Sequence, residues 1–263
     1  MELVDEAYAH LLTITTDPEA GLAATFTRMT HRPPAILLDV GGVFLLPSHD
    51  HIRSALSRIG HSVSDGTTID RAHYEAVRAF PMDLDPGEWF GPYWNDYLEI
   101  YARAIGVDEE LISESIEHLR NEYVTGELWR HVIPGSKEGL AELVDTGIPI
   151  GIVSNSDGTI EQRLNDMGIL QEGPGDGVEV RFVVDSGKVG VEKPDPHIFD
   201  FALDRLAMTA EGIWYVGDTP AFDVVGAARA GLDPILMDPF EVNGEYGVPS
   251  VSSLSVVAKM ATG

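Results

Sequence analysis

The sequence predicts an α/β protein with a doubly wound parallel sheet and a second, α-helical domain inserted into it. Three observations support this prediction. Short apolar runs recur along the chain and end in polar or acidic residues, as strands buried on both faces of a parallel sheet do. Helical segments separate most of these runs, which is the alternation typical of parallel α/β folds. Between residues 47 and 133, in contrast, the periodicity is helical.

The segment before the first apolar run, residues 1–33, is expected to form a helical extension. Short helices are predicted at 2–12 and 17–29, the second of them with an Asp-Pro-Glu start at residues 17–19. The extension fits a packing arm, a dimer contact or a loosely held segment. The sequence leaves all three open, a homodimer included.

The first buried strand is predicted at 35–38, where Ala-Ile-Leu-Leu runs into Asp39. Gly41 and Gly42 follow closely and let the backbone approach a ligand. Open α/β sheets carry their chemistry beyond the carboxyl ends of the strands, so Asp39 is placed for function. Taken alone, the same residues fit an ordinary turn after a strand equally well, and the rest of the chain has to decide.

Residues 47–133 are interpreted as a small helical domain without a buried strand. Three- and four-residue spacing predicts helices around 94–105 and 112–123. An aromatic cluster in this segment could line a substrate pocket, with Trp89 and Tyr93 as the candidates for substrate contact. The cluster consists of Trp89, Phe90, Tyr93, Trp94, Tyr97 and Tyr101. Such a stripe is more often the core of a helix pair.

After residue 133 the alternation of strands and helices becomes regular. Strands are predicted at 148–153, 180–184, 213–216 and 234–237, and helices at 137–146, 159–168, 196–206 and between 223 and 231. The chain therefore divides into a sheet domain made of 34–46 and 134–263, and a helical domain made of 47–133.

The predicted strand ends carry side chains that suit an oxyanion and a hard cation. They are Asp39, Ser154 with Asn155, Lys193 a little beyond its strand, and Asp218 with Asp223. Parallel strands joined by right-handed crossovers bring these residues to one edge of the sheet. Mg²⁺ takes oxygen ligands and keeps several waters, so Asp39, Asp218 and a backbone carbonyl near Gly41 suffice to bind it.

The amino-acid composition limits which binding partners and which cellular location are expected for this protein. The 263 residues include 17 Lys and Arg against 43 Asp and Glu, a net charge of -26. This charge argues against nucleic-acid and anionic-membrane partners, and a phosphorylated substrate would need a cation or a placed lysine to offset it. The absence of cysteine excludes disulfides, thiolate metal sites and a cysteine nucleophile. Without a long apolar run or a basic leader, a cytoplasmic location is expected.

The strand-end motifs, and their order along the chain, resemble those of the haloacid dehalogenase (HAD) superfamily. The resemblance extends from Ala35 to Ala258. The matching stretches are Leu37–Val43, Ile152–Asn155, Lys193–Phe199, and Gly217–Asp218 with Asp223. The helical insertion lies where this family places a C1-type cap. The resemblance therefore implies a Rossmann-like HAD core, and a Mg²⁺-dependent hydrolase that removes phosphate from a small phosphorylated metabolite.

The resemblance also implies roles for individual residues. Asp39 would be the nucleophile that forms an aspartyl phosphate, with Ser154 and Lys193 on the phosphate oxygens. Asp39, the Gly41 carbonyl and Asp218 would bind Mg²⁺, and Asp223 would be a second ligand or an outer carboxylate. Gly42 and Asn155 are the remaining candidates for substrate binding. Lys193 is expected to pair with Asp39 when the site is empty.

One position departs from the phosphatase pattern of the family. Most of its phosphatases carry a second Asp two residues after the nucleophile, as general acid and base, and this chain has Gly41 there. We hypothesise either a substrate with a good leaving group or a replacement acid from the following loop, at His49, Asp50 or His51, although solvated loop residues are the commoner case.

Gly41 also keeps two other functions open. One is metal-independent dehalogenation of a 2-haloacid by Asp39, although that branch usually carries Tyr at the Gly41 position and Ser-Asn in place of Gly217-Asp218. The other is a catalytically idle HAD-like binding module. A complete set of acidic, hydroxyl and lysine residues argues against the idle module, because a scaffold has no need of it.

Overall fold

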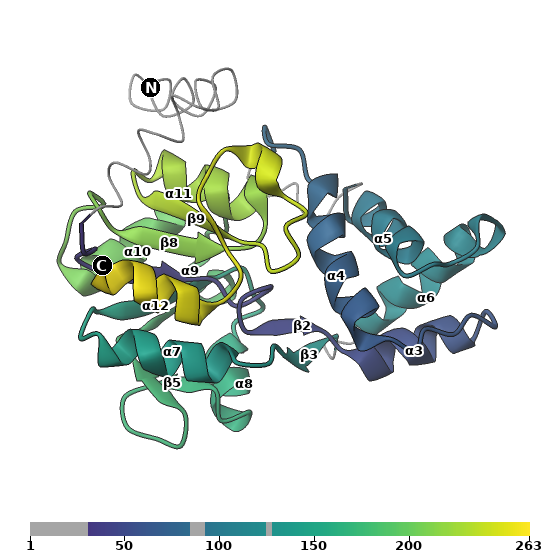
Figure 1. The fold of residues 1–263 in the computed structure, drawn as a ribbon, viewed down its shortest axis with the longest axis horizontal. Coiled ribbons are helices and arrows are strands. Elements are labelled where there is room, and N and C mark those ends of the chain that lie inside the picture. The colour runs from purple at the N-terminus through teal and green to yellow at the C-terminus, as the bar shows by residue number, and fades with distance from the viewer. Residues whose placement is uncertain (1–30, 85–92, 125–127) are drawn as a thin grey trace.

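The computed structural model describes residues 31–84, 93–124 and 128–263. The helices expected at 2–12 and 17–29, and with them most of the predicted extension, lie outside the described residues, as do Trp89 and Phe90. A six-stranded parallel sheet is the centre of the fold, in the order β10-β9-β8-β1-β4-β7 (Figure 1). Its strands are β1 (Ile36–Leu38), β4 (Ile150–Ser154), β7 (Val183–Asp185), β8 (Trp214–Gly217), β9 (Asp233–Met237) and β10 (Ser250–Val251). The predicted α/β class is confirmed.

Helices cover both faces of this sheet, as a doubly wound fold requires. They are α7 (Ser136–Asp145), α8 (Ile160–Asp166), α9 (Ser186–Val189), α10 (His197–Leu206), α11 (Val225–Arg229) and α12 (Leu254–Thr262). Successive side chains of a strand point to opposite faces. Ile36 and Leu38 accordingly pack in one core cluster with residues of α7 and α12, whereas Leu37 packs in another with residues of α10 and α11.

A separate set of helices lies to one side of the sheet (Figure 1). It comprises α3 (His49–Ser57), α4 (Gly66–Ala76), α5 (Tyr93–Ala104) and α6 (Ile112–Val124), with short 3₁₀ turns at Val77–Ala79 and Glu109–Leu111. These helices share a core that includes Ile52, Ile69 and Leu98, and in which Tyr97 and Tyr101 are buried. Three- and four-residue spacing therefore identified the buried face of α5 correctly.

The segment interpreted as helical, 47–133, has strand residues at both of its ends. Here β2 (Leu45–Pro47) and β3 (Trp129–Val132) form an antiparallel ribbon between the sheet and the helices. Along β3 the side chains alternate between half-buried and exposed. So short a strand, buried on one side only, has no apolar run by which the sequence could reveal it.

Other differences concern short elements. The strand predicted at 180–184 is divided at the exposed Arg181, so that β6 (Val178–Val180) pairs with β5 (Leu170–Glu172) while β7 joins the main sheet. Neither β10 nor α12 was predicted. A π-helical turn at Pro220–Val224 precedes α11, and a 3₁₀ turn occupies Gly244–Tyr246. Among the helices of the described residues, none combines the length and the apolar character needed to cross a membrane.

Candidate active site

The carboxyl ends of three neighbouring strands carry the predicted site residues. Asp39 directly follows β1, Ser154 is the last residue of β4, and Asp218 directly follows β8. All three are at most 7% exposed. A cavity of about 490 Å³ opens at this edge, and its lining includes these three residues together with Gly41, Asn155, Lys193 and Asp223. Seven predicted site residues therefore meet at one cavity.

Two predicted substrate contacts do not line this cavity in the described part of the chain. Gly42 lies beside Asp218, where its backbone has a positive φ of 61°. Tyr93 is half-buried at the start of α5, while its neighbours Trp94 and Tyr97 line the cavity instead. Trp89 lies outside the described residues.

Lys193 is the cationic centre of the site. Its Nζ lies 2.8 Å from Asp39 Oδ1 and 2.7 Å from Asp223 Oδ1, and it donates a hydrogen bond to the Tyr215 hydroxyl at 2.8 Å. Only 2% of its surface is exposed. The pairing of Lys193 with Asp39 that the family resemblance implied is present.

Burial and neighbouring charges shift the pKa values of these groups. Burial raises the pKa of Asp39 to about 7, an effect that Lys193 reduces and that Asp223 and Asp218 increase. Burial also raises the pKa of Asp218. For Lys193, burial alone would lower the pKa, but the carboxylates of Asp223 and Asp39 outweigh it and the pKa is raised. Lys193 therefore stays charged, and one buried cation faces three buried carboxyl groups.

This excess of buried carboxylates fits a divalent cation. Asp39, Asp218 and Asp223 each offer an oxygen, and these atoms lie within 4.8 Å of one another. Both oxygens of Asp223 already have partners, since Oδ1 contacts Lys193 and Tyr215 while Oδ2 accepts from the Thr219 amide at 2.8 Å. Asp218 has one short contact, from its Oδ2 to His73 Nε2 at 2.7 Å, while its Oδ1 accepts from the Thr219 hydroxyl only at 3.4 Å. With three contacts of 2.7–3.0 Å, Asp223 is the most firmly held of the three and fits the outer carboxylate that orients Lys193, whereas Asp39 and Asp218 fit direct ligands.

Asn155 is committed to the backbone of Lys193. Its side-chain oxygen accepts from the Lys193 amide at 2.8 Å, and its side-chain nitrogen donates to the Lys193 carbonyl at 2.9 Å. An amide that uses both of its polar ends in this way positions the lysine, which is a different task from the substrate contact expected from the sequence.

Gly42 has a steric reason to be glycine. A Cβ at this position would lie 2.2 Å from Asp218 Cγ, far inside contact distance, and the left-handed backbone adds strain for any other residue. The close approach of the backbone that the sequence predicted here is made to a side chain of the site itself. Gly42 thereby fixes where Asp218 stands.

Replacing Gly42 with alanine tests this packing. We expect Gly42→Ala to lower the free energy of unfolding more than Gly106→Ala, because Gly106 has a positive φ of 84° but open space around its Cβ. The Gly106→Ala control should lose only about 1–2 kcal/mol of its free energy of unfolding, the cost of a left-handed backbone in a residue with a Cβ. Chemical denaturation of both variants measures the difference, and equal losses would show that Asp218 tolerates the added methyl group.

His73 is a site residue that the sequence analysis missed. It is 2% exposed on α4, and its Nε2 lies 2.7 Å from Asp218 Oδ2 while its Nδ1 lies 2.8 Å from the Tyr97 hydroxyl. The helical insertion thus reaches the acidic edge of the sheet. A signal did exist, because His73 occupies the buried stripe of α4 with Ile69 and Ala76, where a polar residue is unexpected.

Trp129 occupies the space beside Gly41. A Cβ at Gly41 would lie 3.5 Å from the Trp129 ring and 3.9 Å from Asp39 Oδ2, both ordinary contact distances. The position therefore has room for a small side chain, and the indole covers it. Trp129 comes from β3, the strand that the sequence analysis did not predict.

The loop residues considered as replacement acids are engaged elsewhere. His49 Nε2 lies 2.6 Å from Asp70 Oδ1, His51 Nδ1 lies 2.9 Å from Glu122 Oε2, and the Asp50 side chain is 95% exposed. Within the described residues, none of the three loop residues lines the cavity. The structure therefore gives no support to an acid from this loop.

These features define an α/β protein with an acidic, lysine-containing site at the carboxyl edge of its parallel sheet. The family model of haloacid dehalogenase-like hydrolases matches residues 88–237, more than half of the chain. The chain belongs to this family and is a HAD-like hydrolase. The resemblance inferred from the sequence motifs is confirmed.

Known relatives agree with this assignment. Haloacid dehalogenase-like hydrolase domain-containing protein 3 of Mus musculus is 28% identical over 207 residues, which cover 73% of this chain and 79% of the relative. Glyceraldehyde 3-phosphate phosphatase of Methanopyrus kandleri is 50% identical over 202 residues, covering 75% and 81%. The HAD-hydrolase YfnB of Bacillus subtilis shares the fold, with a TM-score of 0.53 at 19% identity and coverage of 88% of this chain and 99% of the other.

Proposed function

We propose that this protein is a Mg²⁺-dependent phosphatase of small phosphorylated metabolites that uses Asp39 as its nucleophile. The observation that carries the proposal is the buried contact of Lys193 with both Asp39 and Asp223, at an edge where Ser154 and Asp218 converge. The site combines a nucleophilic carboxylate, a cation for phosphate oxygens and a second carboxylate for a metal ion. Phosphatases among its relatives support this reaction class.

In the proposed reaction Asp39 attacks phosphorus and the leaving-group oxygen departs, which forms an aspartyl phosphate that water then hydrolyses. Lys193 and Ser154 hold oxygens of the transferring group. Asp223 keeps Lys193 in place by the 2.7 Å contact, and Asn155 fixes the lysine backbone. Asp39, Asp218 and the Gly41 carbonyl would hold Mg²⁺, which would neutralise charge on the phosphoryl group.

The substrate is proposed to be small and to carry an organic group that suits aromatic walls. Phe80, Trp94, Tyr97, Trp129 and Phe222 line the cavity beside the acidic edge. Its volume of about 490 Å³ suits a metabolite rather than a macromolecule. We also propose a division into domains. Residues 34–46 and 134–263 form the catalytic core, residues 47–133 form the cap, and residues 1–33 are an extension outside both.

The test is phosphate release from a panel of phosphorylated metabolites, with Mg²⁺ and with EDTA. We expect release that depends on the metal. Reaction in ¹⁸O-labelled water then distinguishes the chemistries, because hydrolysis of an aspartyl phosphate at phosphorus places the label in phosphate. In a dehalogenase the water attacks the ester carbonyl and leaves the label in the Asp39 carboxylate. With a 2-haloacid in place of the phosphorylated metabolites, halide release without metal and label in Asp39 would replace the proposal by the dehalogenase alternative.

The glycine at position 41 leads to a prediction about how the hydrolysis rate depends on the leaving group. The wild-type enzyme should hydrolyse acyl and aryl phosphates far faster than alkyl phosphates, because a side chain that protonates the leaving group is absent from this position. In the Gly41→Asp variant we expect the rate on alkyl phosphates to rise by up to about 10²-fold, the lower end of what a positioned acid contributes. A Cβ at Gly41 would make only ordinary contacts, so the substitution creates no clash at the first atom of the new side chain.

The Gly41→Asn variant is the matched control, since it has the same shape without the acid. Rates on alkyl and aryl phosphates should be compared for the wild type and both variants. An equal gain in Asp and Asn variants would attribute the effect to packing against Trp129 instead of proton transfer.

A further inference from the structure

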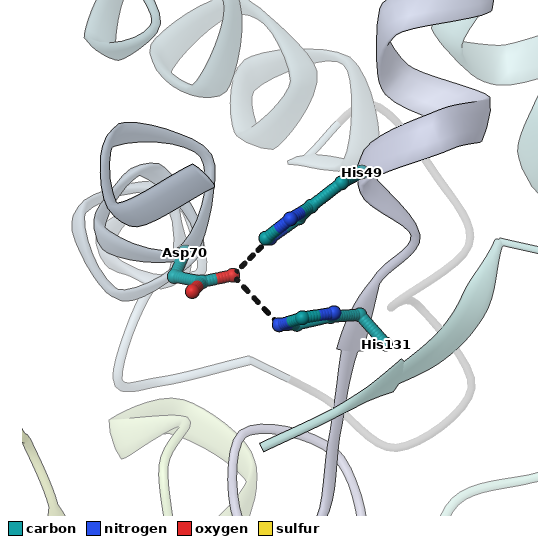
Figure 2. A group of neighbouring side chains, drawn as sticks. All are labelled: His49, Asp70 and His131. Carbon is teal, nitrogen blue, oxygen red and sulfur yellow. Dashed lines mark hydrogen bonds and ion pairs between the residues drawn. The ribbon is translucent and has the colours of Figure 1, made fainter. Parts of the chain in front are cut away.

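A second group of potential metal ligands lies apart from the acidic edge. Figure 2 shows His49, Asp70 and His131 with a nitrogen of each imidazole directed at the Asp70 carboxylate. The potential ligand atoms of the three residues lie within 4.8 Å of one another. Among the described residues, none of these three lines the cavity of the candidate active site.

The three residues come from three different elements. His49 is the first residue of α3, Asp70 lies on α4 and His131 lies on β3. Their side chains are half-buried, with 17%, 19% and 27% of the surface exposed, respectively. Water can therefore complete the coordination of an ion while the protein supplies a fixed set of three ligands.

A simple hydrogen bond accounts for only one of the two histidines. His49 Nε2 lies 2.6 Å from Asp70 Oδ1, whereas His131 Nε2 lies 3.7 Å from the same oxygen, beyond hydrogen-bond distance. The two rings are stacked, with centroids 3.8 Å apart and an interplanar angle of 24°. Both Nε2 atoms therefore face the same carboxylate oxygen, as ligands of one shared ion do.

Arg53 and Gly66 shape the surroundings of the cluster. The Arg53 guanidinium is turned to the Val63 and Ser64 carbonyls. Gly66 makes room for the His49 ring, because a Cβ there would lie 2.7 Å from His49 Cε1.

We propose that His49, Asp70 and His131 form a binding site for a divalent transition-metal ion such as Zn²⁺. Two imidazoles and one carboxylate are a ligand set that suits such ions, and three protein ligands leave positions for water. Mg²⁺ prefers oxygen ligands, so this site differs in its chemistry from the acidic edge.

A bound ion would join α3, α4 and β3. Asp70 is three residues before His73 on α4, so both lie on the same side of that helix. His131 is two residues after Trp129 on the same strand, β3. The ion would therefore hold together the two elements that present His73 and Trp129 to the active-site cavity.

The experiment is a calorimetric titration of the chelator-treated full chain with Zn²⁺ in excess Mg²⁺, which saturates the acidic edge. We expect one Zn²⁺ to bind per chain. The Asp70→Asn and His131→Ala variants should bind Zn²⁺ at least about 10- to 100-fold more weakly. Loss of an outer partner of a metal ligand already costs that much, and these variants lose a ligand itself. Zn²⁺ should also raise the thermal unfolding midpoint of the wild type more than that of the Asp70→Asn and His131→Ala variants.

His197→Ala is the matched control. His197 also contacts a carboxylate, with Nδ1 2.6 Å from Asp195 Oδ1, but it is exposed. This variant should bind Zn²⁺ as the wild type does. Absence of Zn²⁺ binding in the wild type, or equal binding in the wild type and both cluster variants, would overturn the proposal. Because Asp70→Asn preserves shape, it remains informative if His131→Ala fails to fold, and circular dichroism identifies that case.

Discussion

The Lys193→Met variant is expected to lose about 3–5 kcal/mol of its free energy of unfolding, the cost of breaking a buried ion pair by removing one partner. Lys193 is 2% exposed and contacts both Asp39 and Asp223. Methionine fills most of the same volume but leaves two buried carboxylates facing each other without a cation. Urea unfolding in EDTA measures the loss without any contribution from a bound metal ion.

Lys188→Met is the control for this experiment. Lys188 Nζ lies 2.9 Å from Glu161 Oε2, so its ion pair is as short, but half of the Lys188 side chain is exposed. An exposed pair of this kind contributes about 0–1 kcal/mol. Losses of similar size in the two variants would mean that the Lys193 network does not stabilise the fold beyond an ordinary surface pair.

The Asp39→Asn variant is expected to lose phosphatase activity by a factor on the order of 10⁴ to 10⁶, as enzymes do when the nucleophile is removed. An amide of the same shape cannot attack phosphorus. Metal-dependent phosphate release is the measurement, on the substrate that the panel identifies. Activity close to that of the wild type would exclude Asp39 as the nucleophile and with it the proposed function.

Loss of activity in this variant should not come from unfolding. The pKa of Asp39 in the folded chain, about 7, exceeds its ordinary value of 3.8, so ionisation of this group opposes folding. The stabilisation that protonated Asp39 contributes is fully present below pH 3.8 and is lost as the pH rises to about 7. Without metal, the wild type should therefore lose stability relative to Asp39→Asn across this interval, which thermal unfolding at several pH values will show.

The strand-end residues could be predicted from the sequence because each signal is local. An apolar run followed by Asp39, and another followed by Asp218, identify strand ends without knowledge of any neighbour. Parallel connectivity then requires these ends to share an edge. The sheet, the acidic site and the family assignment all follow from this reasoning, and the structure and the family model confirm the fold and the family.

Contacts between elements could not be predicted in the same way. Helical periodicity indicates that one side of α4 is buried, but it does not say that His73 on that side meets Asp218, which lies 145 residues later. Trp129 was missed because β3 is short and buried on one side only. The loop histidine His49 was noticed but assigned to the wrong surroundings, since its partner Asp70 belongs to another element.

The sequence by itself determined the class of fold, the family and the residues at the strand ends, because these depend on patterns within single elements. Only the tertiary structure decided that His73 reaches the acidic edge, that Asn155 holds the backbone of Lys193, and that two histidines share the Asp70 carboxylate. Residue order limits which elements form. The packing of side chains between elements, which depends on shape and charge across the whole chain, selects which of their faces meet.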